Sequence, residues 1–577
     1  MAQPPRFNPL HAMQEAVALQ QQGRLREAEK LYARVLKAAP ENFDALQLLG
    51  LAKAQSGQMG EAFRLMSAAL KINPRAPDVL INLANVLHAL KRDQEALDSL
   101  DKALSLRPGD PNALLNRGNA LLTLSRPQEA LVCFDDVLAR NPRQAAALLS
   151  RGTTLAALGR PDRALGDFDA ALALGHPNAH YNRGNALFEL SRYVEAVAAF
   201  DRALGLTPGN PQAWNNRGNT LTALNRHQEA LESFDKALAL QKDHASAHFN
   251  RALALLALGG WKNGFAEYEW RWKRSGMTDM RRGYGKPLWL GEFPLARKTI
   301  LLHAEQGLGD TIQFARYAPL LARAGATVLL EVQPELTSLL SRLEGVASCH
   351  ARGDKLPAFD VHCPFGSLPL AFKTEPTNVP AAIPYLRADE ARLAKWRPRI
   401  EALPGKRIAL AWAGNASHAN DRNRSIDLNL LEPLLALEGV SFLGIQRELR
   451  ENDAEILARR ANVSNLGGEL ADMDDTAAIV ALADLTISVD TSVVHLAGSL
   501  GRPVWVMLPF APDWRWTPAR DPEKWEPVFG KDHAQAKEPG QRTPWYPQAR
   551  LFRQTTLAAW QDTMTMVRAE LARFIAA

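Results

Sequence analysis

Cysteine is scarce in this chain of 577 residues, which holds only Cys133, Cys349 and Cys363. Three widely spaced cysteines exclude a disulfide framework and lack the spacing of a metal site. The N-terminal residues show no apolar run of the secretory type, and no stretch of about 18 apolar residues could span a membrane. We therefore expect a cytoplasmic protein without a membrane span.

A strong excess of one charge is also missing. Lys and Arg number 68 against 62 Asp and Glu, which leaves a net charge of +6. No block of basic residues with interleaved aromatic residues occurs, so we expect no nucleic-acid partner. Hydrophobic residues make up 46% of the chain, enough for several large cores. At roughly 150 residues per domain, the length predicts three or four domains.

The first half of the chain is a repeat. A helical phrase recurs in steps of 34 residues, with one step of 32, and a small residue stands at each centre. This period is typical of tetratricopeptide repeats, in which helix-turn-helix units stack into an α solenoid with a concave binding face. We assign residues 1–275 to this solenoid. The centres are Ala28, Ala62, Ala96, Ala130, Ala164, Ala196, Ala230 and Gly264.

Asparagine recurs at two positions, three residues apart, in the first helix of successive repeats. Because asparagine is a mediocre helix former, its recurrence needs a reason. Its amide both donates and accepts hydrogen bonds, so it can bind the backbone of an extended peptide. The alternative is that it caps or bridges neighbouring repeats. The candidate peptide-binding residues are Asn82, Asn85, Asn116, Asn119, Asn182, Asn185, Asn216, Asn219 and Asn250.

Arginine and aspartate form a third ladder, which we interpret as structural. Each arginine follows an aspartate by 16 residues, or by 14 in the short repeat. Where the aspartate is absent, at Ala33 and Ser67, leucine replaces the arginine, at Leu49 and Leu83. This joint presence and absence predicts ion pairs between repeats. The pairs are Asp101–Arg117, Asp135–Arg151, Asp169–Arg183, Asp201–Arg217 and Asp235–Arg251.

The period changes after a connector, residues 276–298, which is rich in Gly, Pro and aromatic residues. Short apolar runs then alternate with helical patterns, which predicts parallel βαβ units. Two such sets follow one another, so we expect two doubly wound, Rossmann-like domains over residues 299–396 and 397–577. Ligands of such sheets bind at the carboxyl ends of the strands. Strands are predicted at 299–305, 326–332, 359–364, 407–414, 441–446, 484–490 and 503–509.

The first motif that could carry chemistry is AEQGLGDTIQF, from Ala304. Gly307 and Gly309 lie between a predicted strand and a predicted helix, where backbone N–H groups can point at an anion or a sugar. Asp310 lies at the helix start. It either caps the helix, where the dipole favours a carboxylate, or acts as a general base that deprotonates an acceptor hydroxyl.

The second motif is WAGNASHANDRNRSIDL, from Trp412, which follows the first strand of the last domain. It brings His418, Arg422 and Arg424 into one loop. Arginine can contact a phosphate through two hydrogen bonds, and a nearby cation can offset the charge on a departing phosphate. The alternative is a solvated loop.

The third motif is SVDTSVVHLAGSLGRPVWV, from Ser488. Asp490, Thr491 and Ser492 lie between a strand and a helix, again a place for an anion. His495 lies one turn into the helix, on the face of Thr491. The alternative is a buried histidine whose hydrogen bonds are satisfied locally.

Two further patterns carry less information. The Asp-x-Asp match at residues 472–475 precedes a helix and suits capping better than a metal ion, so we expect no metal site. The aromatic residues around Arg515 and within 544–554 either stack on a base or simply pack.

Together, TILLHAEQGLGDTIQFARYAPLLARAGA, WAGNASHANDRNRSI and DTSVVHLAGSLGRPVWV resemble bacterial tetratricopeptide-linked glycosyltransferases. The catalytic half looks like the heptosyltransferase-type family of the GT-B fold. The resemblance implies Asp310 as the catalytic base and Arg424 at the donor phosphate. This sequence departs from the pattern of that family around 422–425, where those enzymes usually have Lys-Arg-Trp. Residues 518–543 look like an insertion. The candidate donor-binding residues are Gly309, His418, Arg422, Asp490, Thr491, Ser492 and His495.

The plan is also similar to protein O-glycosyltransferases and to flagellin glycosyltransferases of alphaproteobacteria. That similarity implies transfer of a sugar from a nucleotide sugar to Ser or Thr of a protein held by the repeats, with flagellin as one candidate. The nucleotide sugar would be a co-substrate, with no cofactor and no metal. Two alternatives stay open: a glycosyltransferase of a surface lipid or polysaccharide, and a non-enzymatic scaffold with a decayed transferase domain.

Overall fold

The computed structural model describes residues 7–277, 283–380, 382–418, 420–517 and 543–577. The insertion expected at 518–543 therefore lies outside the described residues, apart from Thr543. The chain divides into two compact units, Met1–Gly209 and Asn210–Ala577. The second unit contains the last repeat helices together with both β-sheets.

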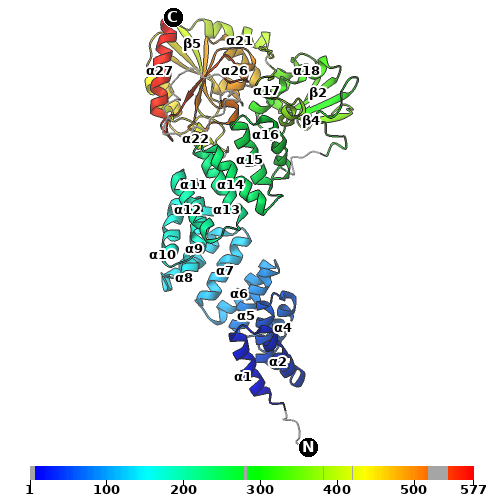
Figure 1. Ribbon diagram of the computed structural model, residues 1–577. Helices are drawn as coiled ribbons and strands as arrows, with labels where there is room; N and C mark the ends of the chain where they lie inside the picture. The colour runs from blue at the N-terminus through cyan, green and yellow to red at the C-terminus, as the bar shows by residue number, and fades with distance from the viewer. Residues whose placement is uncertain (1–6, 278–282, 381, 419, 518–542) are drawn as a thin grey trace, which may run out of the picture. The chain divides into compact units, whose positions relative to one another are not determined.

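The repeats are helix pairs joined by tight turns, as predicted (Figure 1). Within each unit, every repeat helix packs against the next one along the chain. The first unit holds α1 (Pro9–Gln21), α2 (Leu25–Ala38), α3 (Phe43–Gln55), α4 (Met59–Ile72), α5 (Pro77–Ala89), α6 (Asp93–Leu106), α7 (Pro111–Thr123), α8 (Pro127–Arg140), α9 (Ala145–Ala157), α10 (Pro161–Ala173), α11 (Ala179–Glu189) and α12 (Tyr193–Leu206). The second unit continues with α13 (Pro211–Ala223), α14 (His227–Leu240), α15 (Ala245–Ala257), α16 (Trp261–Tyr268) and the 3-10 helix η1 (Glu269–Lys273).

Glycine lets the two helices of a repeat approach closely. A Cβ added at Gly152 would lie 2.6 Å from the ring of Phe168, which is buried between the helices. The same arrangement recurs at Gly118–Phe134, Gly184–Phe200 and Gly218–Phe234.

Replacing Gly152 with alanine should therefore lower the free energy of unfolding by about 1–3 kcal/mol, because it overpacks the phenylalanine ring. Gly166 in α10 is the matched control, since a Cβ there meets nothing within 4 Å. Gly166→Ala should raise stability by about 0.5–1 kcal/mol through helix propensity. Urea unfolding measures the free energy of unfolding of both variants. If the two substitutions changed it equally, overpacking of the phenylalanine ring could not be the cause.

Four of the five predicted arginine–aspartate pairs are confirmed, and the Asp201–Arg217 pair stays a prediction. Arg117, Arg151, Arg183 and Arg251 each bind their predicted aspartate at 2.6–2.9 Å. Their side chains are only 25–28% exposed. These arginines therefore join neighbouring repeats.

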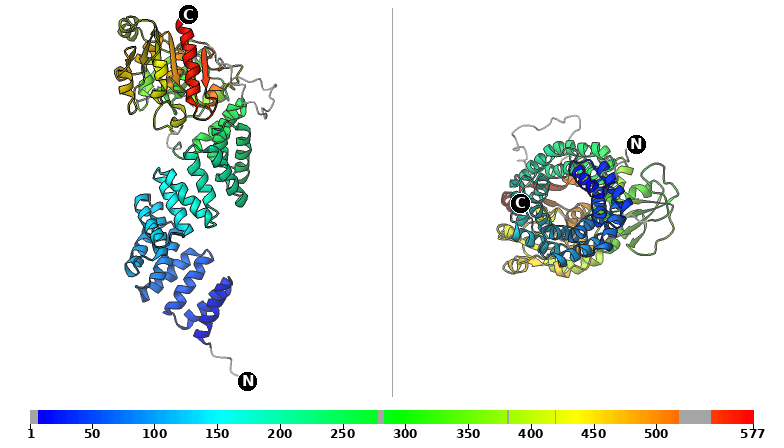
Figure 2. Two further views of the ribbon diagram at one scale, coloured as in Figure 1. Left: turned by 90° about the vertical axis from the view of Figure 1, so that its left-hand side faces the viewer. Right: turned by 90° about the horizontal axis from the view of Figure 1, so that it is seen from below.

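Two parallel sheets form the rest of the second unit. The smaller has the order β3-β2-β1-β4 and the larger β10-β9-β8-β5-β6-β7. In the left view of Figure 2, α27 (Trp560–Ala576) runs along the larger sheet. The strands are β1 (Thr299–His303), β2 (Thr327–Val332), β3 (Val346–Ala351), β4 (Val361–Pro364), β5 (Lys406–Ala411), β6 (Val440–Gly444), β7 (Val463–Asn465), β8 (Leu485–Val489), β9 (Val504–Leu508) and β10 (Ala549–Arg553).

The structure differs from the sequence prediction in one helix and in three strands. The helix predicted to start near Asp310 is two helices, α17 (Leu308–Ala315) and α18 (Ala318–Arg323), with Pro319 in the first turn of the second. Strands β3, β7 and β10 were not predicted. All three are edge strands, and β7 is only three residues long. None of them carries a continuous apolar run.

The interpretation of residues 472–475 as a cap is confirmed. Asp472 is the N-cap of α25 (Met473–Leu482) and accepts hydrogen bonds from the backbone N–H groups of Asp474 and Asp475. Asp475 is buried and binds Lys395 and the indole N–H of Trp396. These carboxylates join α25 to α21 (Glu390–Glu401).

Candidate functional site

The order of the larger sheet places two of the motif loops side by side. Strand β5 has β8 on one side and β6 on the other, so the connections leave β5 in opposite directions. Open α/β sheets bind ligands outside the carboxyl ends of strands at such a switch point. The loop after β5 carries His418, Arg422 and Arg424, and the loop after β8 carries Asp490 and Thr491.

The smaller sheet has its own switch point, between β1 and β4. The loop after β1 carries Glu305, Gly309 and Asp310. Helix α17, which begins at the end of this loop, packs against α26 (Ser492–Ser499), the helix that follows β8 of the larger sheet. A Cβ added at Gly309 would lie 2.7 Å from Cδ2 of His495 and 3.5 Å from Cα of Ser492. The first and third motifs therefore meet where the two sheets join.

Asp310 both caps its helix and pairs with an arginine from the other sheet's domain. Its Oδ2 accepts from the backbone N–H of Gly307 at 3.2 Å, and its Oδ1 accepts from Nη2 of Arg515 at 2.5 Å. Arg515 also donates to Gln313 at 2.7 Å and pairs with Asp513 at 2.9 Å. Burial raises the pKa of Asp310, while Arg515 acts in the opposite direction. Arg515 therefore packs and pairs in the protein interior, and stacking of this region on a base stays a prediction.

Arg424 points toward the turn that precedes α26. Its Nη1 donates to the backbone carbonyl of Asp490 at 3.1 Å, while Nε is buried without a hydrogen-bond partner in the described part of the chain. Gly414 leaves the space for this guanidinium, because a Cβ there would lie 2.5 Å from Nη2. The loop is anchored: Ser425 accepts from the Gly414 N–H at 2.9 Å and donates to the buried Asp421 at 2.7 Å.

The remaining predicted donor residues surround this turn. Burial raises the pKa of Asp490 to about 6. Burial lowers the pKa of His418, with Arg424 adding to the effect and Asp310 opposing it. Thr491 is the N-cap of α26 and makes no side-chain cap bond. Arg422 is exposed on α22 (Asp421–Arg424).

His495 is buried, and its Nδ1 forms a hydrogen bond of 3.1 Å with the hydroxyl of Tyr546. Burial lowers its pKa well below the ordinary value. The ring is thus a neutral packing element between α17, α26 and Tyr546. Its predicted contact with a donor stays a prediction.

A buried ionic network beside Asp310 escaped the sequence analysis. Glu305 follows β1, and its Oε1 accepts from Nη2 of Arg271 at 3.1 Å and from the Gly366 N–H at 3.0 Å. Arg271 belongs to η1 at the end of the repeats and also binds Glu269 at 2.6 Å and Ser367 at 2.7 Å. The Arg271 and Glu305 side chains are 1% and 2% exposed. The network joins the last repeat to the loop that carries Asp310.

Burial raises the pKa of Glu305 to about 7 from an ordinary value of 4.5, although Arg271 opposes the shift. Between these values the folded carboxyl keeps a proton that the unfolded chain has lost, so its contribution to stability falls as pH rises. Relative to Glu305→Gln, the wild type should lose up to about 1.4 kcal/mol per pH unit over this interval. Urea unfolding of both proteins from about pH 5 to pH 8 measures this. If the difference in free energy of unfolding between the wild type and Glu305→Gln did not change with pH, the raised pKa of Glu305 would be contradicted.

Aromatic side chains fix the last repeat helix to the same region. Trp261 of α16 stacks on Trp545 at 5.3 Å between ring centroids and meets Trp514 edge-on at 5.9 Å. Trp514 neighbours Arg515, the partner of Asp310. The end of the repeats is therefore built into the candidate site.

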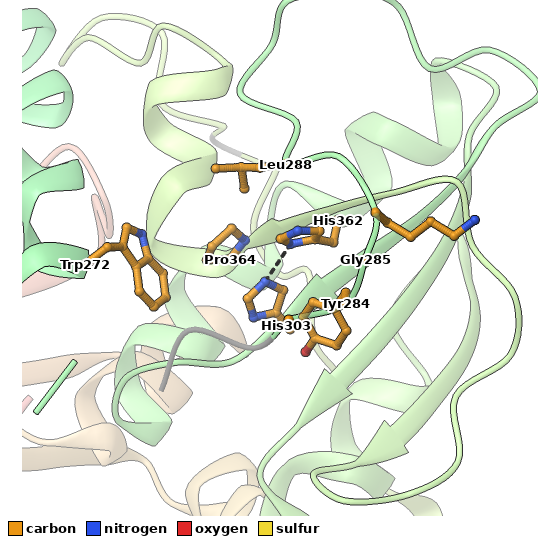
Figure 3. A pocket seen from close by; sticks show the side chains of 9 residues that line it. Trp272, Tyr284, Gly285, Leu288, His303, His362 and Pro364 are labelled. Carbon is orange, nitrogen blue, oxygen red and sulfur yellow. Dashed lines mark hydrogen bonds between the residues drawn. The ribbon is translucent and has the colours of Figure 1, made fainter. Parts of the chain in front are cut away.

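A pocket of about 270 Å³ opens at the carboxyl ends of β1 and β4 (Figure 3). His303 and His362 are joined there by a hydrogen bond of 3.1 Å, and the ring of Tyr284 lies 5.0 Å from each imidazole. The lining residues are Trp272, Gly283, Tyr284, Gly285, Lys286, Leu288, His303, His362 and Pro364. No sequence motif had marked this pocket, because its residues come from four separate segments.

The asparagine ladders serve partly as bridges between repeats. Ser150 donates to Oδ1 of Asn119 at 3.1 Å, and Asn182 donates to Oγ1 of Thr153 at 3.2 Å. In the second unit Asn250 donates to Oδ1 of Asn215 at 3.0 Å. None of the nine predicted asparagines is buried. Bridging and peptide binding are therefore compatible, and peptide binding stays a prediction.

Within the described ranges, no group of three or more His, Cys, Asp or Glu side chains is arranged to hold a metal ion. None of the helices described is long and apolar enough to cross a bilayer.

Comparison with known proteins identifies the first half. The tetratricopeptide repeat family matches residues 115–178, 151–211 and, in a second form, 211–244. Residues 21–103 match the family "Anaphase-promoting complex, cyclosome, subunit 3". The chain thus carries tetratricopeptide repeats, followed by a C-terminal α/β region.

More particularly, the chain is similar to Protein FlbA of Caulobacter vibrioides, with 26% identity over 311 residues. The match covers 50% of this chain and 48% of FlbA, so the chain spans about half the length of this curated relative.

Solved structures are similar over shorter parts. A tetratricopeptide repeat protein from Parabacteroides merdae is 19% identical and covers 43% of this chain and 98% of its own, with a TM-score of 0.37. YrrB, described as a TPR protein with an unusual peptide-binding site, is 28% identical and covers 32% of this chain and 95% of its own, with a TM-score of 0.27.

Proposed function

We propose that this protein is a glycosyltransferase of the GT-B type that moves a sugar from a nucleotide sugar to a Ser or Thr hydroxyl of a bound protein. One observation carries the proposal. The loops after β1, β5 and β8 come together where the two sheets join: Gly309 packs against His495 and Ser492 of α26, and Arg424 donates to the Asp490 carbonyl just before α26. Burial raises the pKa of Asp310, which follows Gly309, and Arg515 is the cation beside it. Perturbed carboxylates beside cations at a sheet switch point are typical of sites that carry chemistry.

The proposed reaction is a single displacement. Asp310 takes the proton of the acceptor hydroxyl, and the hydroxyl oxygen forms a bond to the anomeric carbon of the sugar. The bond from that carbon to the phosphate oxygen breaks, and the nucleotide leaves with the electron pair. Arg424 and the N-terminus of α26 stabilise the negative charge on the departing phosphate.

The repeats would supply the acceptor. None of the ladder asparagines is buried, and an amide group can bind an extended backbone without reading its side chains. The Trp261 and Arg271 contacts support a fixed path from the last repeat to Asp310. Flagellin is the candidate acceptor, on the resemblance of the sequence to flagellin glycosyltransferases.

Thermal unfolding with a panel of CMP-, UDP-, GDP- and ADP-sugars tests the donor site. A donor at 100 times its dissociation constant should stabilise the wild type by about 2.7 kcal/mol. Arg424→Ala should lose most of this shift. Arg399→Ala, which removes an exposed ion pair with Glu469, should keep it. No response across the panel would count against the proposal and favour a binding scaffold.

A further inference from the structure

The arginine ladder has a third position in each complete repeat. Four of the five ladder arginines also contact the residue 16 positions later, on the second helix of their own repeat: Arg117, Arg151, Arg217 and Arg251. Arg151 pairs with Asp167 at 2.7 Å in this way, and Arg117 donates to Sγ of Cys133 at 3.2 Å. The long side chain therefore fills the space between three consecutive helices.

In the first two repeats the same three positions hold Ala33, Leu49 and Leu65. None of them can form an ion pair, and none reaches across as arginine does. A groove of about 530 Å³ lies there, between α2, α3 and α4. Leu49 and Leu65 are 6% and 7% exposed and form an apolar floor together with Leu36.

The rim of this groove is basic. Arg26, Lys30, Lys53 and Arg64 face two acidic residues, Glu29 and Glu61. Lys53 pairs with Glu29 at 2.9 Å and Arg64 approaches Glu61 at 3.7 Å. Arg26 and Lys30 make no ion pair with any described residue, so two positive charges remain.

The basic rim is particular to this end of the solenoid. The position of Lys30 holds Asp98 in the third repeat and Val132 in the fourth. The asparagine ladders begin later, at Asn82. The groove is thus distinct from the ladders in both position and chemistry.

We propose that this groove is a second protein-binding site, and that its ligand is a short segment of a partner protein in which apolar side chains alternate with acidic ones. An apolar side chain of the segment packs on Leu49 and Leu65, while neighbouring carboxylates meet Arg26 and Lys30. The proposal does not depend on the transferase activity.

Fluorescence anisotropy with the full chain and three labelled peptides tests the site. One peptide alternates Glu and Leu, a second replaces Glu with Lys, and a third replaces Leu with Ser. The Glu–Leu peptide should bind, and added salt should weaken it. The other two should bind at least about tenfold more weakly, since each lacks half of the recognised chemistry.

The double variant Ala33→Asp, Leu49→Arg installs the ion pair found in later repeats and should fill the groove. It should weaken the Glu–Leu peptide about tenfold. Ser67→Asp, Leu83→Arg makes the same change at the next gap and should not. Lys30→Glu, on an exposed position, should weaken binding a few-fold even if the double variant fails to fold.

Equal binding of the Glu–Leu and Glu–Ser peptides would overturn the proposal, because charge alone would then explain it. Unchanged binding by Lys30→Glu would also overturn it. So would tighter binding to anionic lipid vesicles than to the Glu–Leu peptide.

Discussion

Sugar transfer should fall by about 10²- to 10⁴-fold when Asp310 is replaced by asparagine, while nucleotide-sugar affinity changes little. The amide cannot take the proton of the acceptor hydroxyl. Asparagine keeps a side-chain oxygen that can accept from the Gly307 N–H, so the loss should not come from a lost cap. Asp310 is suited to the role because its side chain stays 24% exposed and burial raises its pKa. Initial rates with a saturating donor measure the effect.

Asp472→Asn is the matched control. Asp472 also caps a helix, pairs with an arginine, and is 27% exposed. Its variant should show a similar change in unfolding temperature and unaltered transfer. If Asp310→Asn lowers transfer no more than Asp472→Asn does, Asp310 is a cap and the base lies elsewhere.

Replacing Arg271 with methionine should lower the free energy of unfolding by about 3–5 kcal/mol. The guanidinium is buried among Glu269, Glu305 and Ser367, so its removal leaves carboxylates without a counter-charge. Denaturant unfolding of the full chain gives the value. Hydrogen exchange should also quicken in residues 304–310, which the network holds.

Arg117→Met removes a half-buried ladder arginine by the same substitution and should cost only about 0–1 kcal/mol, because its partner Asp101 is 52% exposed. A second control adds Glu269→Gln and Glu305→Gln to Arg271→Met. It should recover most of the lost stability, since no uncompensated charge remains. Equal losses for Arg271→Met and Arg117→Met would contradict the account of a buried network.

Features that repeat along the chain could be predicted from the sequence. The Arg–Asp pairs could be predicted because five aspartates are each followed by an arginine after 16 residues, or 14 in the short repeat, and because both residues are absent together at Ala33 and Leu49. The motif loops were visible because each follows an apolar strand, and strand order then brings their ends together.

Single contacts between distant segments could not be predicted. Arg515 meets Asp310 across 205 residues, and Arg271 meets Glu305 across 34 residues with no repeated companion. Edge strands β3 and β10 also escaped, because they carry polar or charged residues among the apolar ones. Tertiary packing, and not local pattern, decides such features.

Transfer itself is the most direct test of the central claim. The purified chain is incubated with the nucleotide sugar that stabilises it and with flagellin, and the intact mass of flagellin is measured. Flagellin should gain the mass of one or more sugar residues with matching release of nucleotide, and should gain none with Asp310→Asn. A nucleotide sugar that binds while the wild type releases no nucleotide and leaves the acceptor mass unchanged would contradict this claim.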